Sequence, residues 1–202
     1  MSKELIETFF STPIYITEKP EWVSDTNKFC QPYLDESHLT HQSEVKRIGS
    51  DFGLVYHSTS IQDDPNLKYL TDWIGQTAHK VMTEWGADLS NHTLIYESMW
   101  VQEFAKSGGG FHNTHIHEND HISGFYYLRC SDKTSVPVFH DPRPGALQSN
   151  LPEKNKFDIT FASKNFHYKP VPGTLILFNS YVPHEYRLDI GFDDFRFIHF
   201  NI

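Results

Sequence analysis

The spacing of hydrophobic residues changes once along the chain, near residue 92, and this change limits the folds that the chain can adopt. Between Asp64 and Gly86 the apolar residues recur every three or four positions, and Asp64 with Pro65 provides a helix start. After residue 92, short runs of β-branched and aromatic residues are separated by Gly, Pro, Asn and Asp. Helices followed by many short strands predict a mainly β fold, a jelly roll with helices on one outer face.

The second half of the chain has room for about eight short strands. We expect them at residues 94–104, 115–117, 122–128, 136–140, 157–162, 174–178, 184–188 and 195–202. In the first half, residues 5–17 predict a first strand, and residues 20–33 predict a helix that Pro32 shortens or kinks.

Length and charge exclude several classes of protein. We expect one domain over residues 1–202, with a mainly helical support region and first strand in 1–92 and the β core in 93–202. The formal net charge of −9 argues against nucleic acid as a partner, because such binding depends on Lys and Arg placed on phosphates. No apolar run is long enough to cross a membrane, and the N-terminus does not resemble a secretion signal. Cys30 and Cys130 are too few for a disulfide framework. From these three observations together we expect a cytoplasmic protein without a membrane partner.

The most distinctive stretch contains four histidines between residues 112 and 121. Two of them, His115 and His117, are separated by one residue. On an extended strand, residues two apart share a face and their backbones lie about 6–7 Å apart. Both imidazoles can then bind one first-row metal ion, whose nitrogen ligands lie about 2 Å away. The pair predicts two adjacent ligands of a metal site, and a third must come from elsewhere in the chain.

A second candidate region lies near the C-terminus. His184 follows an apolar strand and a bend at Pro183, and Arg196 lies twelve residues later in the last strand. A strand, a turn containing Gly191 and a return strand would place His184 and Arg196 in one pocket. A buried guanidinium needs an anion, because an unpaired one costs several kcal/mol. The carboxylate of a small acid would fit it bidentately.

The order and spacing of several motifs resemble those of the Fe(II)/2-oxoglutarate-dependent oxygenases. The motifs are FFSTPIYIT near the N-terminus, Trp100, HIHENDHISGFYYL, FHDPR, PGTLILFNSYVPH and RFIHFN. They are most similar to those of the small prolyl-hydroxylase-like oxygenases of bacteria and bacteriophages, and the similarity extends over essentially the whole chain. The resemblance implies a double-stranded β-helix, which is a cupin-like jelly roll, with Fe(II) in its pocket and 2-oxoglutarate as cosubstrate.

The resemblance also implies roles for single residues. His115 matches the first iron ligand, His184 matches the distal ligand, and Arg196 matches the salt-bridge partner of the cosubstrate's remote carboxylate. Many relatives place Ser or Thr two residues after this arginine, whereas this chain has Ile198.

The position of the second iron ligand departs from the common pattern. Most of the superfamily has Asp or Glu where this chain has His117. A three-histidine centre carries one negative charge fewer, so its metal ion would be the stronger Lewis acid. Glu118 and Asp120 are the alternative ligands if the strand bulges here.

Other residues are candidates for the rest of the pocket. Side chains alternate along residues 122–128, so only one of Tyr126 and Tyr127 can face the pocket, and we predict Tyr127 as a cosubstrate-binding residue. Candidates for contacting the substrate or supporting the ligands are His112, Trp100, Gln102, Ser123 and Arg143. We interpret the remaining histidines of the second half, including His121, His140 and His199, as ordinary structural or surface residues. Residues 141–156 contain three prolines, which is typical of a lid or a disordered loop.

These observations predict an oxygenase, with hydroxylation as its default reaction. It would couple oxidation of a C–H bond by dioxygen to decarboxylation of 2-oxoglutarate to succinate, on an unidentified small-molecule or peptide substrate. One alternative is a cupin-type dioxygenase that uses three histidines and no cosubstrate, with Arg196 holding the carboxylate of the substrate. Another is a non-catalytic jelly-roll binding or structural protein. The oligomeric state stays open.

Overall fold

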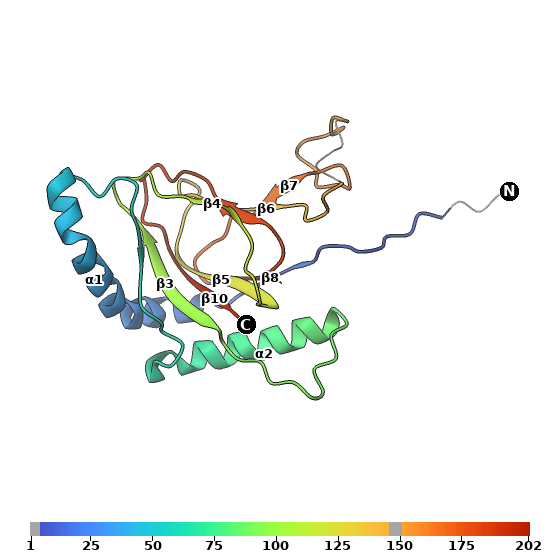
Figure 1. Ribbon diagram of the computed structural model, residues 1–202, viewed down its shortest axis with the longest axis horizontal. Coiled ribbons are helices and arrows are strands. Elements are labelled where there is room, and N and C mark those ends of the chain that lie inside the picture. The colour runs from blue at the N-terminus through green and yellow to red at the C-terminus, as the bar shows by residue number, and fades with distance from the viewer. Residues whose placement is uncertain (1–4, 146–150) are drawn as a thin grey trace.

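Two antiparallel sheets face each other in the computed structural model, which describes residues 5–145 and 151–202. The larger sheet contains, in spatial order, β1 (Ile14–Glu18), β8 (Thr174–Asn179), β5 (Ile122–Arg129), β10 (Arg196–Asn201), β3 (Ser98–Phe104) and β2 (Val55–His57). The smaller sheet contains β4 (His112–His115), β9 (His184–Tyr186), β6 (Pro137–His140) and β7 (Asn165–His167). Both helices lie on the outer side of the larger sheet (Figure 1). The prediction of a mainly β jelly roll with N-terminal helices on one face is confirmed.

The first long helix extends further than the sequence predicts. A short 3-10 helix, η1 (Pro20–Trp22), leads into α1 (Val23–Ile48), which continues past Pro32 and ends at Gly49 with a φ of 81°. The prediction that Pro32 shortens this helix is wrong. Its buried residues recur at three- and four-residue steps on both sides of the proline: Thr26, Cys30, Leu34 and Ser37. Packing of this face on the sheet offsets the one backbone hydrogen bond that a proline removes.

The second helix forms as expected. The carboxylate of Asp64 accepts a hydrogen bond from the backbone N–H of Asn66, which starts η2 (Pro65–Leu67), and α2 (Lys68–Glu84) follows directly. No helix in the described part of the chain is both long and apolar enough to cross a membrane.

The molecule has two hydrophobic cores, one on each face of the larger sheet. The outer core joins the helices to the sheet and contains Leu34 of α1, Ile74 of α2 and the sheet residues Val101 and Ile198. The inner core lies between the two sheets and is almost entirely aromatic. Its main residues are Phe104, Phe125, Tyr127, Phe139, Phe178, Tyr186, Phe195 and Phe197. Alternation along each strand sends successive side chains to different cores, and this decides which residues can reach the interior.

One strand lies elsewhere than the sequence predicts. Residues 157–162 lie in turns, and their apolar side chains Phe157, Ile159 and Phe161 are exposed. The edge strand of the smaller sheet is β7 instead, which pairs with β6. Alternating apolar residues satisfy the strand pattern, but here they have no partner strand. Residues 146–150 of the predicted 141–156 loop lie outside the described residues, so the lid stays a prediction.

Candidate metal centre

Three histidines meet at one end of the smaller sheet. His115 ends β4 and pairs directly with His184, which begins β9. His117 follows two residues after β4, where its backbone N–H donates to the carbonyl of Ser180 at 3.0 Å. The ligand nitrogens of the three rings all lie within 4.8 Å of one another. Two nitrogens bound about 2 Å from one ion lie roughly 3–4 Å apart, so small side-chain rotations would complete the site.

Backbone carbonyls fix the orientation of two of these rings. His115 Nδ1 lies 2.7 Å from the carbonyl oxygen of Asn113, and His184 Nδ1 lies 3.0 Å from that of Val182. A carbonyl only accepts, so each Nδ1 carries the proton and each Nε2 keeps a free lone pair. The Nε2 atoms of His117 and His184 are buried without a hydrogen-bond partner. This is the arrangement that metal-binding histidines adopt, and the three residues fit an Fe(II) ion.

Burial keeps the imidazoles of His117 and His184 neutral. It lowers the pKa of His184 to about 3, although the hydrogen bond to Val182 opposes the shift and neighbouring histidines add to it. Burial, followed by repulsion from His115, lowers the pKa of His117 to about 4. The neutral form is the one that binds a metal ion, so no proton has to leave these two histidines near neutral pH.

The three histidines line a small aromatic cavity of about 100 Å³. It is lined by Trp100, Gln102, His112, His115, His117, Phe125, His184, Tyr186, Phe197 and His199. Three of the predicted pocket residues are therefore present. Trp100 Nε1 donates to Gln102 Oε1 at 3.0 Å, and the amide nitrogen of Gln102 lies 2.9 Å from His112 Nε2. This hydrogen-bonded chain fixes the position of His112 beside the metal site.

His199 is a cavity residue that the sequence analysis missed. It lies on β10, is 5% exposed, and its Nε2 is buried without a partner. Its ring centroid lies 4.8 Å from that of His117 and 4.4 Å from that of Trp100. The available signal was alternation along the last strand, which places His199 on the same face as Phe197.

Ser123 lies behind the metal site rather than in the cavity. Its hydroxyl donates to Asn201 Oδ1 at 2.7 Å, and Asn201 Nδ2 lies 3.4 Å from His117 Nδ1. An amide nitrogen only donates, so Asn201 would orient His117 as an Nε2 ligand with its amide turned over, Oδ1 accepting from Nδ1–H, and the Ser123 hydroxyl can pair with either end of this amide. The sequence analysis did not single out Asn201.

Tyr127, and not Tyr126, faces the barrel interior. Its hydroxyl lies 2.5 Å from the hydroxyl of Tyr186, and burial raises the pKa of both phenols, so both stay protonated. Tyr186 lines the cavity, and Tyr127 lies behind it. The hydroxyl of Tyr126 points the other way and donates to the carbonyl of Lys19 at 2.7 Å.

Arg196 does not face the cavity. Its guanidinium forms a buried ion pair with Glu103, with nitrogen–oxygen distances of 2.6 and 2.8 Å. It also donates to Asn27 Oδ1 at 3.1 Å and to Gln31 Oε1 at 3.0 Å, both on α1. The prediction that Arg196 shares a pocket with His184 is wrong.

The reason is the alternation of side chains along β10. Arg196 and Ile198 point to the helix side of the larger sheet, whereas Phe197 and His199 point inward. Spacing along the sequence locates a strand but not the face on which each of its residues lies. The anion that Arg196 needs is the protein's own Glu103.

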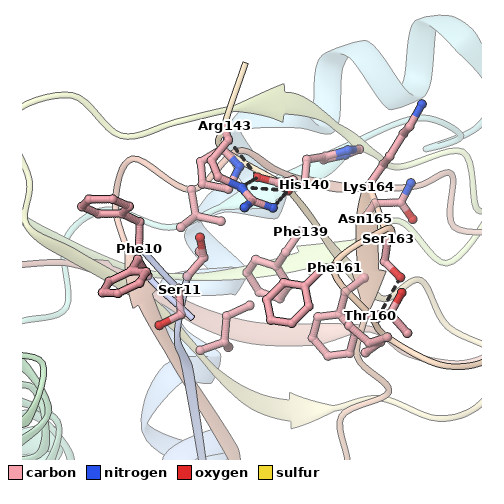
Figure 2. Close-up of a pocket in the computed structure, with 18 residues that line it drawn as sticks. Phe10, Ser11, Phe139, His140, Arg143, Thr160, Phe161, Ser163, Lys164 and Asn165 are labelled. Atoms are coloured by element: carbon pink, nitrogen blue, oxygen red, sulfur yellow. Dashed lines mark hydrogen bonds and ion pairs between the residues drawn. The ribbon is translucent and has the colours of Figure 1, made fainter. Parts of the chain in front are cut away.

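Arg143 lies in a different cavity. Figure 2 shows this cavity, of about 440 Å³, between the N-terminal segment, strand β6 and the loop that leads to β7. Arg143 is held there by Asp141, with a shortest distance of 2.5 Å between guanidinium and carboxylate. The prediction that Arg143 lies at the rim of the histidine pocket is therefore wrong.

The alternative carboxylate ligands lie outside the group of three histidines. Glu118 is exposed and Asp120 is partly buried, and neither belongs to the group whose ligand atoms converge. Asn119 between them adopts a φ of 66°, so the chain turns directly after His117. This geometry favours His117 as the second ligand.

The comparisons with known proteins point to one class. Residues 98–191, just under half of the chain, match the family described as "Putative 2OG-Fe(II) oxygenase". The matched span includes all three histidines and ends before Arg196. Among curated proteins, none matches the sequence significantly.

Solved structures share the fold. A prolyl-4-hydroxylase from Pseudomonas putida has 12% identity and a TM-score of 0.52, with 95% of this chain and 93% of that chain covered. AviO1 from Streptomyces viridochromogenes has 9% identity and a TM-score of 0.57, with 94% and 89% covered. The α-ketoglutarate-dependent carbocyclase SnoK of nogalamycin biosynthesis has 10% identity and a TM-score of 0.61, with 94% and 79% covered.

The family match over residues 98–191 and the fold shared with oxygenases of known structure confirm the resemblance to the 2-oxoglutarate/Fe(II)-dependent oxygenases that was recognised in the sequence. Fe(II) and 2-oxoglutarate are the metal and the cosubstrate of this class. The histidines fit the metal. The expected arginine anchor for the cosubstrate does not fit, because Arg196 is bound to Glu103 on the other side of the sheet.

Proposed function

We propose that this protein is an oxygenase of the 2-oxoglutarate/Fe(II) class that binds iron through His115, His117 and His184 and hydroxylates a small molecule or a peptide. The observation that carries the proposal is the convergence of three imidazoles on one cavity inside the jelly roll. The buried, unpartnered Nε2 atoms of His117 and His184 support it, since buried polar atoms without partners cost stability unless a ligand satisfies them.

The protein's own residues would hold and shield the iron. When bound, the iron would supply the activation of dioxygen for oxidising a C–H bond. His115 and His184 are oriented by backbone carbonyls, which increases the basicity of their ligand nitrogens. Phe125 and Phe197 form apolar walls that exclude water, and the Gln102–His112 pair places polar groups beside the iron position.

The proposal is tested by loading the protein with Fe(II) under anaerobic conditions. We expect one iron per chain, and release of carbon dioxide from a 2-oxo acid only when iron and dioxygen are both present. His184→Ala should lose both the iron and the reaction. His121→Ala is the matched control, because His121 lies in the same loop region but is exposed. Wild-type protein that binds no iron would refute the proposal and favour a non-catalytic jelly-roll protein.

A second candidate is a three-histidine oxygenase that uses no cosubstrate. The position of Arg196 favours it, because the anchor expected for 2-oxoglutarate points away from the cavity. Such an enzyme would consume dioxygen with its substrate and release no carbon dioxide from any 2-oxo acid. The assay above therefore separates the two candidates.

The substrate and the setting remain part of the proposal. A prolyl hydroxylase from Trichoplax adhaerens, solved with a peptide of hypoxia inducible factor, shares the fold at 12% identity and a TM-score of 0.50. One fold supports many reactions, so a peptide and a small molecule are both candidates. We place the protein in the cytoplasm of a bacterium or a phage-infected host, where Cys30 and Cys130, which form no disulfide, would stay reduced.

A further inference from the structure

We infer that the organic ligand of this metal centre has an uncharged remote end, so that the centre takes a 2-oxo acid with a neutral tail in preference to 2-oxoglutarate. The inference rests on the proposed function, since it assumes that iron binds at the three histidines. It goes beyond that function because it names the chemical class of the cosubstrate.

The cavity offers no cation for a second carboxylate. None of the described residues that line it is a lysine or an arginine. A histidine that binds the metal must be neutral, so the three ligands add no positive charge. The chelating carboxylate would offset one of the two positive charges of the iron, and the remaining charge would lie at the chelating end of the acid, away from its remote end. A remote carboxylate would then be buried without a partner, which is strongly unfavourable.

Arg196 cannot supply the missing charge without disrupting the fold. Its side chain is 3% exposed, and that of Glu103 is 4% exposed. Turning Arg196 inward would leave the buried carboxylate of Glu103 with only His38 Nε2, 3.4 Å away, and would break both contacts to α1. The inward position next to it on β10 is filled by Phe197, whose ring centroid lies 4.8 Å from that of Tyr186.

The side chains that back the cavity are apolar and offer a ligand at most one weak polar group. Phe195 and Phe197 pack around Tyr127, with ring centroids 6.3 and 5.4 Å from its ring. The hydroxyls of Tyr127 and Tyr186 have two protons between them, and one is used in their mutual hydrogen bond. The remaining proton can satisfy one neutral acceptor but cannot balance a full negative charge.

The proposed reaction is balanced without a further reductant. A 2-oxo acid, dioxygen and the C–H bond of the substrate give carbon dioxide, the carboxylic acid shortened by one carbon, and the alcohol. Oxidation of the 2-oxo acid and of the C–H bond supplies the four electrons that reduce dioxygen. One oxygen atom enters the new carboxylic acid, and the other enters the substrate.

The test compares two ligands that differ only at the remote end. Under anaerobic conditions, Fe(II)-loaded protein is titrated with 2-oxoglutarate and with 2-oxopentanoate, which has a methyl group in place of the remote carboxylate. Binding is followed by the visible absorption of the Fe(II) chelate and by the shift in melting temperature. We expect 2-oxopentanoate to bind at least about tenfold more tightly.

A double variant provides the matched control for the arginine. Arg196→Met combined with Glu103→Leu replaces the buried ion pair with apolar side chains, and circular dichroism with urea unfolding checks that it folds. We expect it to bind both acids with wild-type affinity.

The remaining outcomes separate the inference from the proposed function. Tighter binding of 2-oxoglutarate, or its selective loss in a folded double variant, would overturn the inference. Binding of iron without binding of either acid would also overturn it and leave the iron site intact. Failure to bind iron at all would refute the proposed function, and the inference with it.

Discussion

Strand β10 separates two regions that differ in whether their buried polar side chains have partners within the protein. On the helix side, Arg196 is fully partnered by Glu103 and by two side chains of α1. On the inner side, His199 is just as buried, but its Nε2 has no partner. The surroundings of Arg196 are therefore complete without a ligand, whereas the inner side is arranged to receive one. The difference shows that burial of a charged residue in a barrel strand does not by itself mark a binding site.

Removing Arg196 should have the largest effect on stability and is therefore the strongest test of this difference. Arg196→Met leaves the buried Glu103 carboxylate with only His38 Nε2 nearby, at 3.4 Å, and breaking a buried pair in this way costs about 3–5 kcal/mol. We expect the free energy of unfolding, measured in urea, to fall by about that amount. If Arg196 held a ligand instead, the variant would keep its stability and lose only ligand affinity.

The double variant Arg196→Met with Glu103→Leu tests whether the loss of stability comes from the unpaired charge of Glu103. Replacing both members of a buried ion pair with apolar residues is often neutral for stability, so most of the loss should be recovered. Equal instability of the single and double variants would mean that the contacts to Asn27 and Gln31, and not the charge pair, stabilise this region.

Acid should destabilise the inner region of the metal-free protein. Burial lowers the pKa of His112 and His117 to about 4, and it lowers the pKa of His199 well below its usual value. The unfolded chain takes up these protons near pH 6.5, whereas the folded chain does not, so stability is constant above that pH and falls below it.

The size of this effect is set by the number of buried imidazoles. Each of these three imidazoles contributes about 1.3 kcal/mol, so we expect the free energy of unfolding to fall by about 4 kcal/mol between pH 7 and pH 5.5. His199→Phe removes one titrating group and should make the pH dependence shallower. A stability that is unchanged over this range would contradict the neutral, buried state of the histidines.

Much of this architecture could be predicted from the sequence, because it depends on local patterns. Helical spacing predicted the helix that starts at Asp64, and the separation of His115 and His117 predicted that both rings could reach one point. These features depend only on residues close together in the chain.

The errors concern features that depend on the register between distant segments. The face on which Arg196 lies follows from how β10 pairs with β3 and β5, and the register shifts at this residue. Its partner Glu103 lies on β3, and the spacing of residues within the last strand carries no information about that contact. Similarly, residues 157–162 have the pattern of a strand but no neighbouring strand to pair with.

The second metal ligand offers a more specific test of the inner region. His117→Ala removes one of three converging nitrogens, and we expect the affinity for Fe(II), or for Co(II) as a more stable probe, to fall at least about 100-fold. His117→Asp recreates the two-histidine, one-carboxylate arrangement and should stay within about tenfold of the wild type. Equal loss in both variants would mean that the position tolerates only imidazole. If the alanine variant kept the full affinity for the metal ion, another group, such as Glu118 or Asp120, would be the ligand.

The smallest expected effect comes from the residue that supports His117 from behind. Asn201 is 4% exposed, lies on the inner side of β10, and its amide nitrogen lies 3.4 Å from His117 Nδ1. Groups that orient a metal ligand typically contribute about 10- to 100-fold to metal affinity, and this long contact belongs at the lower end. We expect Asn201→Ala to weaken Co(II) binding about tenfold, measured by titration at constant pH. Ser98→Ala is the control, because it removes the other partner of the same amide at 3.0 Å without touching His117. If Ser98→Ala weakened Co(II) binding as much as Asn201→Ala does, the effect would come from general loosening of the strand and not from the orientation of His117.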